Sequence, residues 1–192
     1  MAKKFIILDT ETTGLEVRQG HKIIEIGAVV LNDRKKSSDH FHAYINPGRA
    51  IDEEASKVHG ISNKDLENEP MFAAIADDFI EFIQGSTLII HNAPFDVGFL
   101  NSELKSVSAK YPKLEDICEI EDSLVLARNK FPGQRNSLDA LANRFEVSGY
   151  DRSFHGALLD ANILADVYIY LTGGQSKFEF LDNTSTLNND QT

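Results

Sequence analysis

The chain has 192 residues, of which 42% are hydrophobic, and this length and composition predict one folded domain rather than a disordered chain. Its formal net charge of −11 argues against a general basic groove for nucleic acid, although bound cations would invert the local field of an acidic site. The single cysteine, Cys118, excludes an internal disulfide, and no stretch approaches the ~20 apolar residues of a membrane span. We therefore expect a cytoplasmic protein.

Four strands are expected in the first half of the chain. Residues 4–9 and 22–31 are mostly apolar runs, which are typical of buried strands, and residues 39–46 alternate between polar and apolar. Residues 35–38, two lysines and two serines, are expected to form the hairpin turn before the third strand. A fourth short apolar run, at residues 87–91, is expected to be the next strand.

Helices are expected between and after these strands. Residues 71–84 carry Phe and Ile side chains at helical spacing, and Gly85 provides a stop signal. The chain is expected to become helical again after Pro94. Three further helices are expected at residues 121–130, 137–145 and 156–171. Ser137 is the expected N-cap of the second of these, and Gly173-Gly174 the stop of the third.

The order of these elements indicates an α/β domain over residues 1–174, with a mixed sheet and helices packed on it. Residues 47–70 are mixed and polar and are punctuated by proline and glycine, as in connecting segments. Residues 175–192 are rich in Asn, Thr, Asp and Gln, and we expect them to form a flexible C-terminal tail.

Acidic residues follow two of the expected strands and recur on the last helix. Asp9 and Glu11 are two residues apart, so their side chains share a face if the extended conformation lasts that long. Two carboxylates on one face form half of a site for a hard metal ion, although a turn acid is the ordinary alternative. Asp96 falls in the first turns of a helix, where the helix dipole alone would favour an acid. Asp160 lies among the apolar residues of the last helix and needs a partner there.

His155 precedes Asp160 by five residues, which is about 140° on an ideal helix, so the two side chains cannot share a helical face. We therefore expect His155 in the loop or first turn before the last helix. A solvated loop histidine is the ordinary alternative. With an ordinary pKa of about 6.5, a histidine there suits a general base near neutral pH.

Three motifs occur in an order and spacing that resemble the exonuclease motifs of the DEDDh superfamily. They are D-x-E at Asp9 and Glu11, N-x-x-F-D from Asn92 to Asp96, and H-x-x-x-x-D from His155 to Asp160. The segments GHKIIEIGAV, VHGIS and HGALLDANILADVYIYLTGGQ further resemble the proofreading epsilon subunits of bacterial DNA polymerase III, and the likeness covers about residues 5–180. The resemblance implies a ribonuclease-H-like fold, with a mixed five-stranded sheet and helices on both faces.

The resemblance also implies an activity, which is metal-dependent 3′→5′ DNA exonuclease proofreading for the replicative polymerase, with release of nucleoside 5′-monophosphates. Two divalent ions, Mg²⁺ or Mn²⁺, would be held by the four acids of the motifs, and His155 would be the general base. The expected catalytic residues are Asp9, Glu11, Asp96, His155 and Asp160, and the four acids among them are the expected metal ligands.

Further residues follow from the same resemblance. The 3′-terminal nucleotide of single-stranded or frayed DNA is expected to contact Thr12, Thr13, Leu15, Glu54 and His59, with Asn92 orienting the motif loop. A solvated helix acid is the alternative for Glu54.

The tail carries the expected partner site. Gln175, Phe178 and Phe180 have the pattern of a peptide that binds the sliding clamp within residues 175–180, unless the phenylalanines pack back on the domain. The DNA polymerase III alpha subunit is the other expected partner at the replication machinery. Family members carry a longer C-terminal segment for that subunit, and this chain ends 12 residues after Phe180, so this expectation is left open.

Alternative functions remain open at this level. A 3′→5′ exoribonuclease of the oligoribonuclease or RNase T kind would share the fold, and a preference for RNA cannot be deduced from these residues. If the chain were a non-catalytic nucleic-acid or clamp-binding module, we would expect a catalytic acid to be missing, yet all five motif residues are present. A calcium-binding or structural α/β protein would bind metal without hydrolysis.

Overall fold

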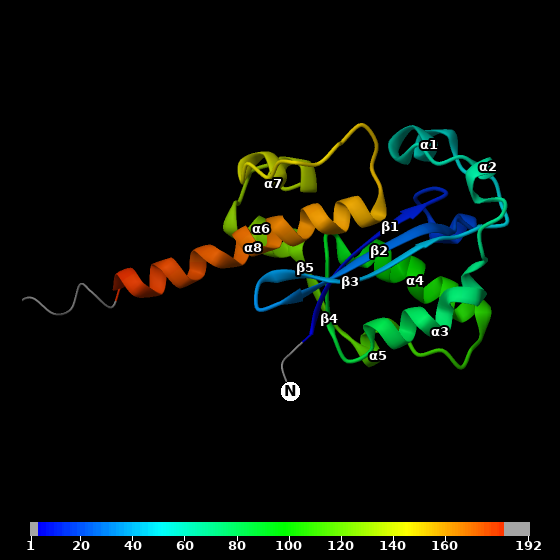
Figure 1. Ribbon diagram of the computed structural model, residues 1–192, viewed down its shortest axis with the longest axis horizontal. Coiled ribbons are helices and arrows are strands. Elements are labelled where there is room, and N and C mark those ends of the chain that lie inside the picture. Colours follow the sequence, from blue (N-terminus) through cyan, green and yellow to red (C-terminus); the bar gives the residue numbers. More distant parts are fainter. Residues whose placement is uncertain (1–3, 183–192) are drawn as a thin grey trace, which may run out of the picture.

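A central mixed sheet organises the chain in the computed structural model, which describes the backbone of residues 4–182 and the side chains of residues 4–173 (Figure 1). The sheet has five strands in the order β3-β2-β1-β4-β5. They are β1 Phe5–Thr12, β2 Ile23–Asn32, β3 Lys35–Tyr44, β4 Thr87–Ile90 and β5 Glu119–Asp122. β1 pairs with β2 antiparallel and with β4 parallel, so the predicted mixed α/β sheet is confirmed.

Helices cover both faces of this sheet (Figure 1). They are η1 Val17–Gln19, α1 Glu53–His59, α2 Asn63–Leu66, α3 Phe72–Ile83, α4 Ala93–Val107, α5 Leu114–Ile117, α6 Ser123–Lys130, α7 Leu138–Arg144 and α8 Ala157–Asp182. Because side chains alternate along β1, Ile6 faces the apolar cluster under α3 and α4, whereas Ile7 faces α8. Among the described residues, no helix is both long and apolar enough to cross a membrane.

The expected helices at 71–84 and 137–145 are confirmed as α3 and α7. The Ser137 hydroxyl caps α7 by accepting a hydrogen bond from the amide of Ala140 at 3.2 Å. The hairpin turn, however, lies earlier than residues 35–38, which belong to β3. Asp33 and Arg34 form the turn with φ values of 45° and 66°. A two-residue hairpin loop of this kind requires positive φ at both positions, and no glycine marks it in the sequence.

The end of the chain also differs from the prediction. α8 does not stop before Gly173-Gly174 but continues to Asp182. Glycine weakens a helix interior by about 1 kcal/mol without removing a backbone hydrogen bond, so two glycines do not have to end it. The backbone of residues 175–182 is therefore helical. The side chains of Gln175, Phe178 and Phe180, and all of residues 183–192, lie outside the described part, so the tail and its clamp peptide stay predictions.

Candidate active site

Three of the predicted acids meet where the end of β1 lies under the first turn of α8. One carboxylate oxygen from each of Asp9, Glu11 and Asp160 lies within 4.8 Å of the other two. Asp9 and Glu11 share a face because β1 stays extended as far as Thr12, beyond the predicted end of the strand. A cluster of carboxylate oxygens is the donor set that Mg²⁺ and Mn²⁺ prefer.

Asp96 lies in the first turn of α4 and is buried beside this group. Its Oδ1 accepts hydrogen bonds from the amide of Thr10 at 3.1 Å and from the Thr10 hydroxyl at 2.6 Å. It is not a member of the three-acid cluster of Asp9, Glu11 and Asp160. Its charge still acts on Asp9, as the pKa of that residue shows. The structure therefore brings the fourth predicted acid to the edge of the cluster.

The pKa values of these acids are raised, as expected where carboxylates are buried close to one another. Burial, and then repulsion from Asp96, Glu11 and Asp160, raises the pKa of Asp9 well above its usual range. Burial and the neighbouring acids likewise raise the pKa of Glu11 to about 8. The pKa of Asp96 rises to about 7, chiefly because of burial. The Arg152 guanidinium, which bonds to Asp160, offsets only part of this negative charge. A bound divalent cation supplies more positive charge, so the residues present fit such an ion.

His155 lies in the loop directly before α8, as predicted. Its Nδ1 is 3.1 Å from Oδ2 of Asp160, and its side chain is 39% exposed. The backbone amide of His155 donates to the carbonyl of Val58 at 3.0 Å, which ties the loop to α1. A carboxylate on one ring nitrogen fixes the orientation of the imidazole while the ring remains accessible. His155 is thus held beside the three-acid cluster in a position suited to proton transfer.

Glu25 is a site residue that the sequence analysis missed. It is 2% exposed and lies opposite Glu11 in the pairing of β1 with β2. Its Oε2 accepts a hydrogen bond from the amide of Ala157, the first residue of α8, at 2.9 Å, and its Oε1 is 2.8 Å from Nε2 of His42. Glu25 therefore fixes the start of α8 on the sheet. An acid within an otherwise apolar strand was the signal, since buried acids almost always have partners.

Arg152 and Asp139 were also missed. The Arg152 guanidinium bonds to Asp160 and to Asp139, which lies in the first turn of α7. Both residues come from segments with no expected role in metal binding, and no spacing rule joins them to the motifs. Asp166, six residues after Asp160 on α8, is half-buried and accepts a hydrogen bond from the Tyr150 hydroxyl at 2.6 Å.

The predicted nucleotide-binding residues after the D-x-E motif differ in how free their side chains are. Leu15 is 78% exposed. The Thr12 hydroxyl donates to the carbonyl of Gly14 at 2.6 Å. Thr13 is fully buried, and its hydroxyl bonds to Nδ1 of His21 at 2.9 Å and to the amide of Lys22 at 3.0 Å. The Thr13 side chain thus stabilises the loop, whereas Leu15 is open to solvent.

Glu54 and Asn92 also occupy exposed positions. The Glu54 carboxylate pairs with Lys57 one turn along α1, at 2.8 Å. Asn92 adopts the left-handed conformation with φ of 68° at the turn between β4 and α4, and its amide donates to Oδ1 of Asp122 at 3.0 Å. Asparagine tolerates this conformation better than most residues, so Asn92 sets the entry of the helix that carries Asp96.

His59 differs from these residues, because it is buried and incompletely bonded. Its Nδ1 accepts a hydrogen bond from the amide of Ile61 at 3.0 Å, but its Nε2 has no hydrogen-bond partner within residues 4–173. Burial lowers the pKa of His59. The nearby Thr12 carbonyl opposes this fall, although it forms no hydrogen bond of normal geometry with Nε2. A buried polar atom left without a partner costs free energy unless a ligand or water satisfies it.

Comparisons with known proteins agree with this arrangement. The model of the Exonuclease family matches residues 6–168. The chain is 53% identical over 185 residues to DNA polymerase III subunit epsilon of Rickettsia typhi, which covers 96% of this chain and 81% of the relative. It is 49% identical over 179 residues to DNA polymerase III subunit epsilon of Escherichia coli strain K12, which covers 91% of this chain and 74% of that protein.

Solved structures show the same fold. Exonuclease X in complex with 5′ overhanging duplex DNA is similar with a TM-score of 0.71 at 26% identity, over 90% of this chain and 93% of that one. A 3′-exonuclease solved for recognition of the histone mRNA stem-loop has a TM-score of 0.75 at 20% identity, over 90% of this chain and 82% of that one, which shows the fold alone. From its sequence and fold, the chain belongs to the Exonuclease family and, within it, to the epsilon subunits of DNA polymerase III.

Proposed function

We propose that this chain removes nucleotides from the 3′ end of DNA as the proofreading exonuclease of the replicative DNA polymerase and releases nucleoside 5′-monophosphates. The observation that carries the proposal is the cluster of Asp9, Glu11 and Asp160 beside His155. Membership of the epsilon subunits supports DNA over RNA as the substrate. An exoribonuclease with the same fold is the alternative, and a comparison of DNA and RNA substrates distinguishes the two activities.

Two divalent ions, Mg²⁺ or Mn²⁺, are the proposed cofactors of this site. Asp9, Glu11 and Asp160 are three of the proposed ligands. Asp96 is the proposed fourth ligand, through Oδ2, because both hydrogen bonds from Thr10 go to Oδ1. When bound, the ions supply positive charge that offsets the charge developing on the phosphate oxygens. The raised pKa values of Asp9 and Glu11 support this assignment, because the cluster is short of positive charge.

His155 is the proposed general base. It would accept a proton from the attacking water, while Oδ2 of Asp160 at its Nδ1 holds the ring in one orientation. The resulting imidazolium would be stabilised by the same carboxylate. The hydrogen bond from the His155 amide to Val58 fixes the backbone of the loop, so the ring needs little reorganisation during the reaction.

The 3′-terminal nucleotide is proposed to lie against the residues that follow the D-x-E motif. His59 is the best supported contact, because its Nε2, which has no partner in the described part of the chain, can bond to a sugar or phosphate oxygen. Leu15 offers an exposed apolar side chain to a sugar or base. Thr12, Thr13, Glu54 and Asn92 stay predictions as contacts, and the bonding of Thr13 favours a supporting role.

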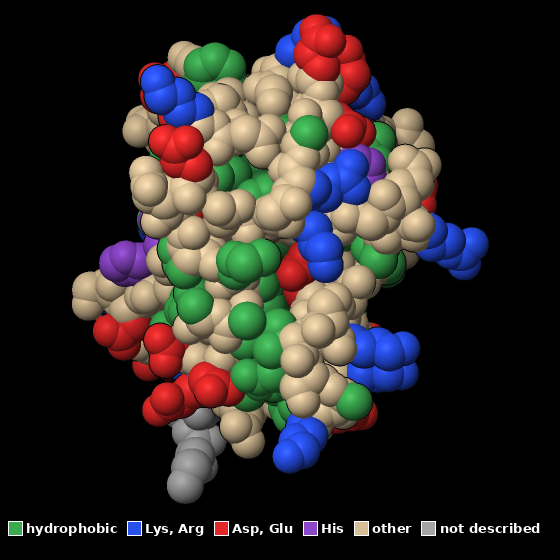
Figure 2. All heavy atoms as spheres, turned by 90° about the vertical axis from the view of Figure 1, so that its right-hand side faces the viewer, with side chains coloured by type: hydrophobic (Ala, Val, Ile, Leu, Met, Phe, Trp, Pro, Cys, Tyr) green, Lys and Arg blue, Asp and Glu red, His purple; other side chains and the backbone are tan. Residues whose placement is uncertain are grey.

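One face of the molecule has a surface that suits a DNA strand. Figure 2 shows the side that carries α1 and α2 in Figure 1, where hydrophobic side chains run down the centre and Lys and Arg side chains gather along the right-hand edge. Bases can lie on apolar surface while cations contact phosphates, although the chain as a whole is acidic.

Two partners are proposed beyond the DNA, namely the alpha subunit of DNA polymerase III and the sliding clamp. Residues 175–180 remain the proposed clamp peptide. Because the backbone there is helical, binding as an extended peptide would require the end of α8 to unwind.

The activity is tested on 5′-labelled single strands of DNA and of RNA, with Mg²⁺, Mn²⁺ or EDTA. Asp9→Ala is the inactive comparison, and Asp78→Ala on exposed α3 surface is the matched control. We expect a metal-dependent ladder from the 3′ end of DNA with wild type and Asp78→Ala only. A ladder on RNA alone would favour the exoribonuclease, and metal binding without either ladder would favour a non-catalytic module.

A further inference from the structure

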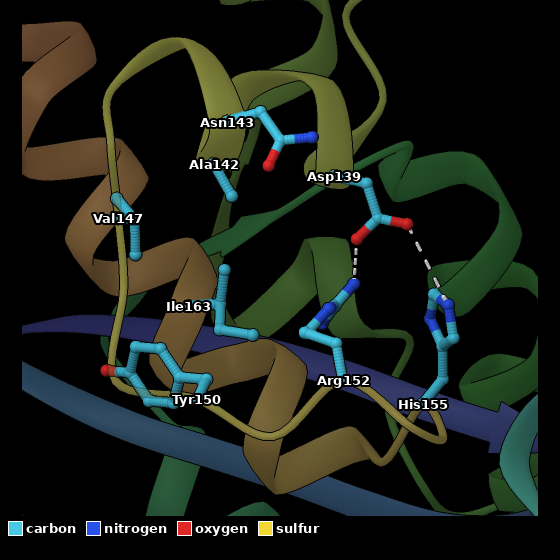
Figure 3. A pocket seen from close by; sticks show the side chains of 8 residues that line it. All are labelled: Asp139, Ala142, Asn143, Val147, Tyr150, Arg152, His155 and Ile163. Atoms are coloured by element: carbon cyan, nitrogen blue, oxygen red, sulfur yellow. Dashed lines mark hydrogen bonds and ion pairs between the residues drawn. The ribbon is translucent and has the colours of Figure 1, made fainter.

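Arg152 joins two carboxylates that come from different helices. Its Nη1 bonds to Oδ1 of Asp160 at the start of α8, and its Nη2 bonds to Oδ1 of Asp139 at the start of α7, the second contact being visible in Figure 3. The Asp160 side chain is 7% exposed, whereas that of Asp139 is 55% exposed. A planar guanidinium that spans two carboxylates places a permanent positive charge at a defined position.

His155 faces the same two acids. Its Nδ1 is 3.1 Å from Oδ2 of Asp160, and its Nε2 is 3.9 Å from Oδ2 of Asp139 (Figure 3). Both oxygens of Asp160 are therefore engaged, one by Arg152 and the other by His155. Asp160 also belongs to the three-acid cluster proposed to hold metal. A divalent ion bound by that cluster must share this carboxylate with the guanidinium.

The surroundings give the guanidinium room to move. Arg152, Asp139 and His155 line one end of a pocket of about 310 Å³ between α7, the loop before α8 and α8 itself (Figure 3). The remainder of the wall is formed by Ala142, Asn143, Val147, Tyr150 and Ile163. Because Asp139 is half-exposed and lies at the pocket, Arg152 can withdraw from Asp160 and keep its second partner.

We propose that Arg152 is a positioning residue that competes with the divalent ion for Asp160, and that Asp139 retains the guanidinium when the ion binds. The inference rests on the proposed metal-dependent function. The positive charge of Arg152 weakens ion binding, and Asp139 reduces that effect by drawing the guanidinium away. Loss of Arg152 therefore tightens metal binding, whereas loss of the Asp139 charge weakens it only while Arg152 is present.

Binding of Mn²⁺ to the full chain, after removal of metals with EDTA, tests this without reference to activity. The probe is the electron paramagnetic resonance signal of free Mn²⁺. We expect Arg152→Gln to lower the Kd for Mn²⁺ by about three- to ten-fold and Asp139→Asn to raise it by a similar factor. The double variant should bind as Arg152→Gln does, because Asp139 acts through Arg152. Arg18→Gln, at an exposed position on η1, controls for the change in net charge.

Arg152→Lys adds a conservative variant, because lysine keeps the charge but cannot span two carboxylates. Its Kd is expected to lie between those of wild type and Arg152→Gln. Weaker Mn²⁺ binding by Arg152→Gln, or an Asp139→Asn effect of equal size in the double variant, would overturn the inference. If Arg18→Gln tightened binding as much as Arg152→Gln, the effect would be one of net charge, and the inference would again fail. Absence of Mn²⁺ binding by the wild type would instead overturn the metal site on which both proposals depend.

Discussion

Gly27 lies directly opposite Asp9 in the pairing of β1 with β2, and the first residues of α8 pack on its bare Cα. A Cβ at this position would lie 2.2 Å from the backbone nitrogen of Leu158 and 2.4 Å from the carbonyl carbon of Ala157. These atoms are helix backbone and cannot turn aside. The missing side chain therefore lets α8 approach the sheet closely enough to bring Asp160 to Asp9.

The substitution Gly27→Ala should separate these two acids. We expect the start of α8 to shift outward, with a loss of about 1–3 kcal/mol in the free energy of unfolding. Exonuclease activity should fall by about 10²-fold or more, because the metal ligands lose their spacing. Urea denaturation and single-strand hydrolysis measure the two effects.

Gly98→Ala is the matched control for this variant. Gly98 lies at an exposed position within α4, and a Cβ there would meet no atom within 4 Å. Alanine suits a helix better than glycine, so we expect unchanged activity and a gain of up to about 1 kcal/mol in stability. Wild-type turnover by Gly27→Ala would show that the close approach does not set the geometry of the acids.

Glu25 should contribute to stability through the position of its hydrogen-bond acceptors more than through its charge. Glu25→Ala removes the acceptor for the Ala157 amide and the partner of His42, and we expect it to cost about 1–3 kcal/mol. Glu25→Gln keeps a carbonyl oxygen for one of these groups and should cost less. Denaturation in EDTA measures both variants. Equal losses for the two would indicate that the charge of Glu25, and not its acceptor geometry, holds α8.

The predictable part of the site lies within single strands, helices and motifs. Asp9 and Glu11 share a face because of strand periodicity, which is a local property, and the five-residue spacing placed His155 in a loop before α8. The pairing of Arg152 with Asp139 could not be deduced in this way. Those residues are 13 positions apart, and they meet only because α7 and the loop before α8 pack together.

The fold shows the same division. β1, β2 and β4 are mainly apolar and match predicted strands. The edge strand β5 carries three acids among its four residues, and the sequence predicts the start of a helix at its second half. An edge strand has only one neighbour to satisfy, so its sequence carries a weaker pattern. The hydrogen bond that the Ala157 amide donates to Glu25 spans 132 residues and depends on the complete sheet and on α8.

The stability of the protein in EDTA should fall as the pH rises from about 4.5 to about 8. Glu11 has its pKa raised from 4.5 to about 8 and Asp96 from 3.8 to about 7. At a pH between its unfolded and its folded pKa, each group has released its proton in the unfolded chain but still holds it in the folded chain. The folded state therefore binds more protons, and its stability decreases with increasing pH. Thermal unfolding in EDTA across this range measures the slope.

Saturating Mn²⁺ should flatten that slope, because the ion replaces the protons as the compensating positive charge. Glu11→Gln should also reduce the slope in EDTA, since it removes one of the titrating groups. A stability in EDTA that increases from pH ~5 to pH ~8 would contradict the raised pKa values.

His155→Ala should separate proton transfer from metal binding. Loss of a general base typically costs about 10²–10⁴-fold in rate, and we expect a fall of this size in hydrolysis under saturating Mn²⁺. The Kd for Mn²⁺ should remain close to the wild-type value, because the three clustered acids are intact.

His40→Ala, at an exposed histidine on β3 whose Nδ1 lies 3.0 Å from the Ser38 carbonyl, is the matched control and should retain full activity. Because residual hydrolysis by His155→Ala would depend on water without a base, its rate should also increase with pH beyond the point where the wild type levels off. A wild-type rate and pH profile in His155→Ala would rule out His155 as the base and leave the three-acid cluster to act without it.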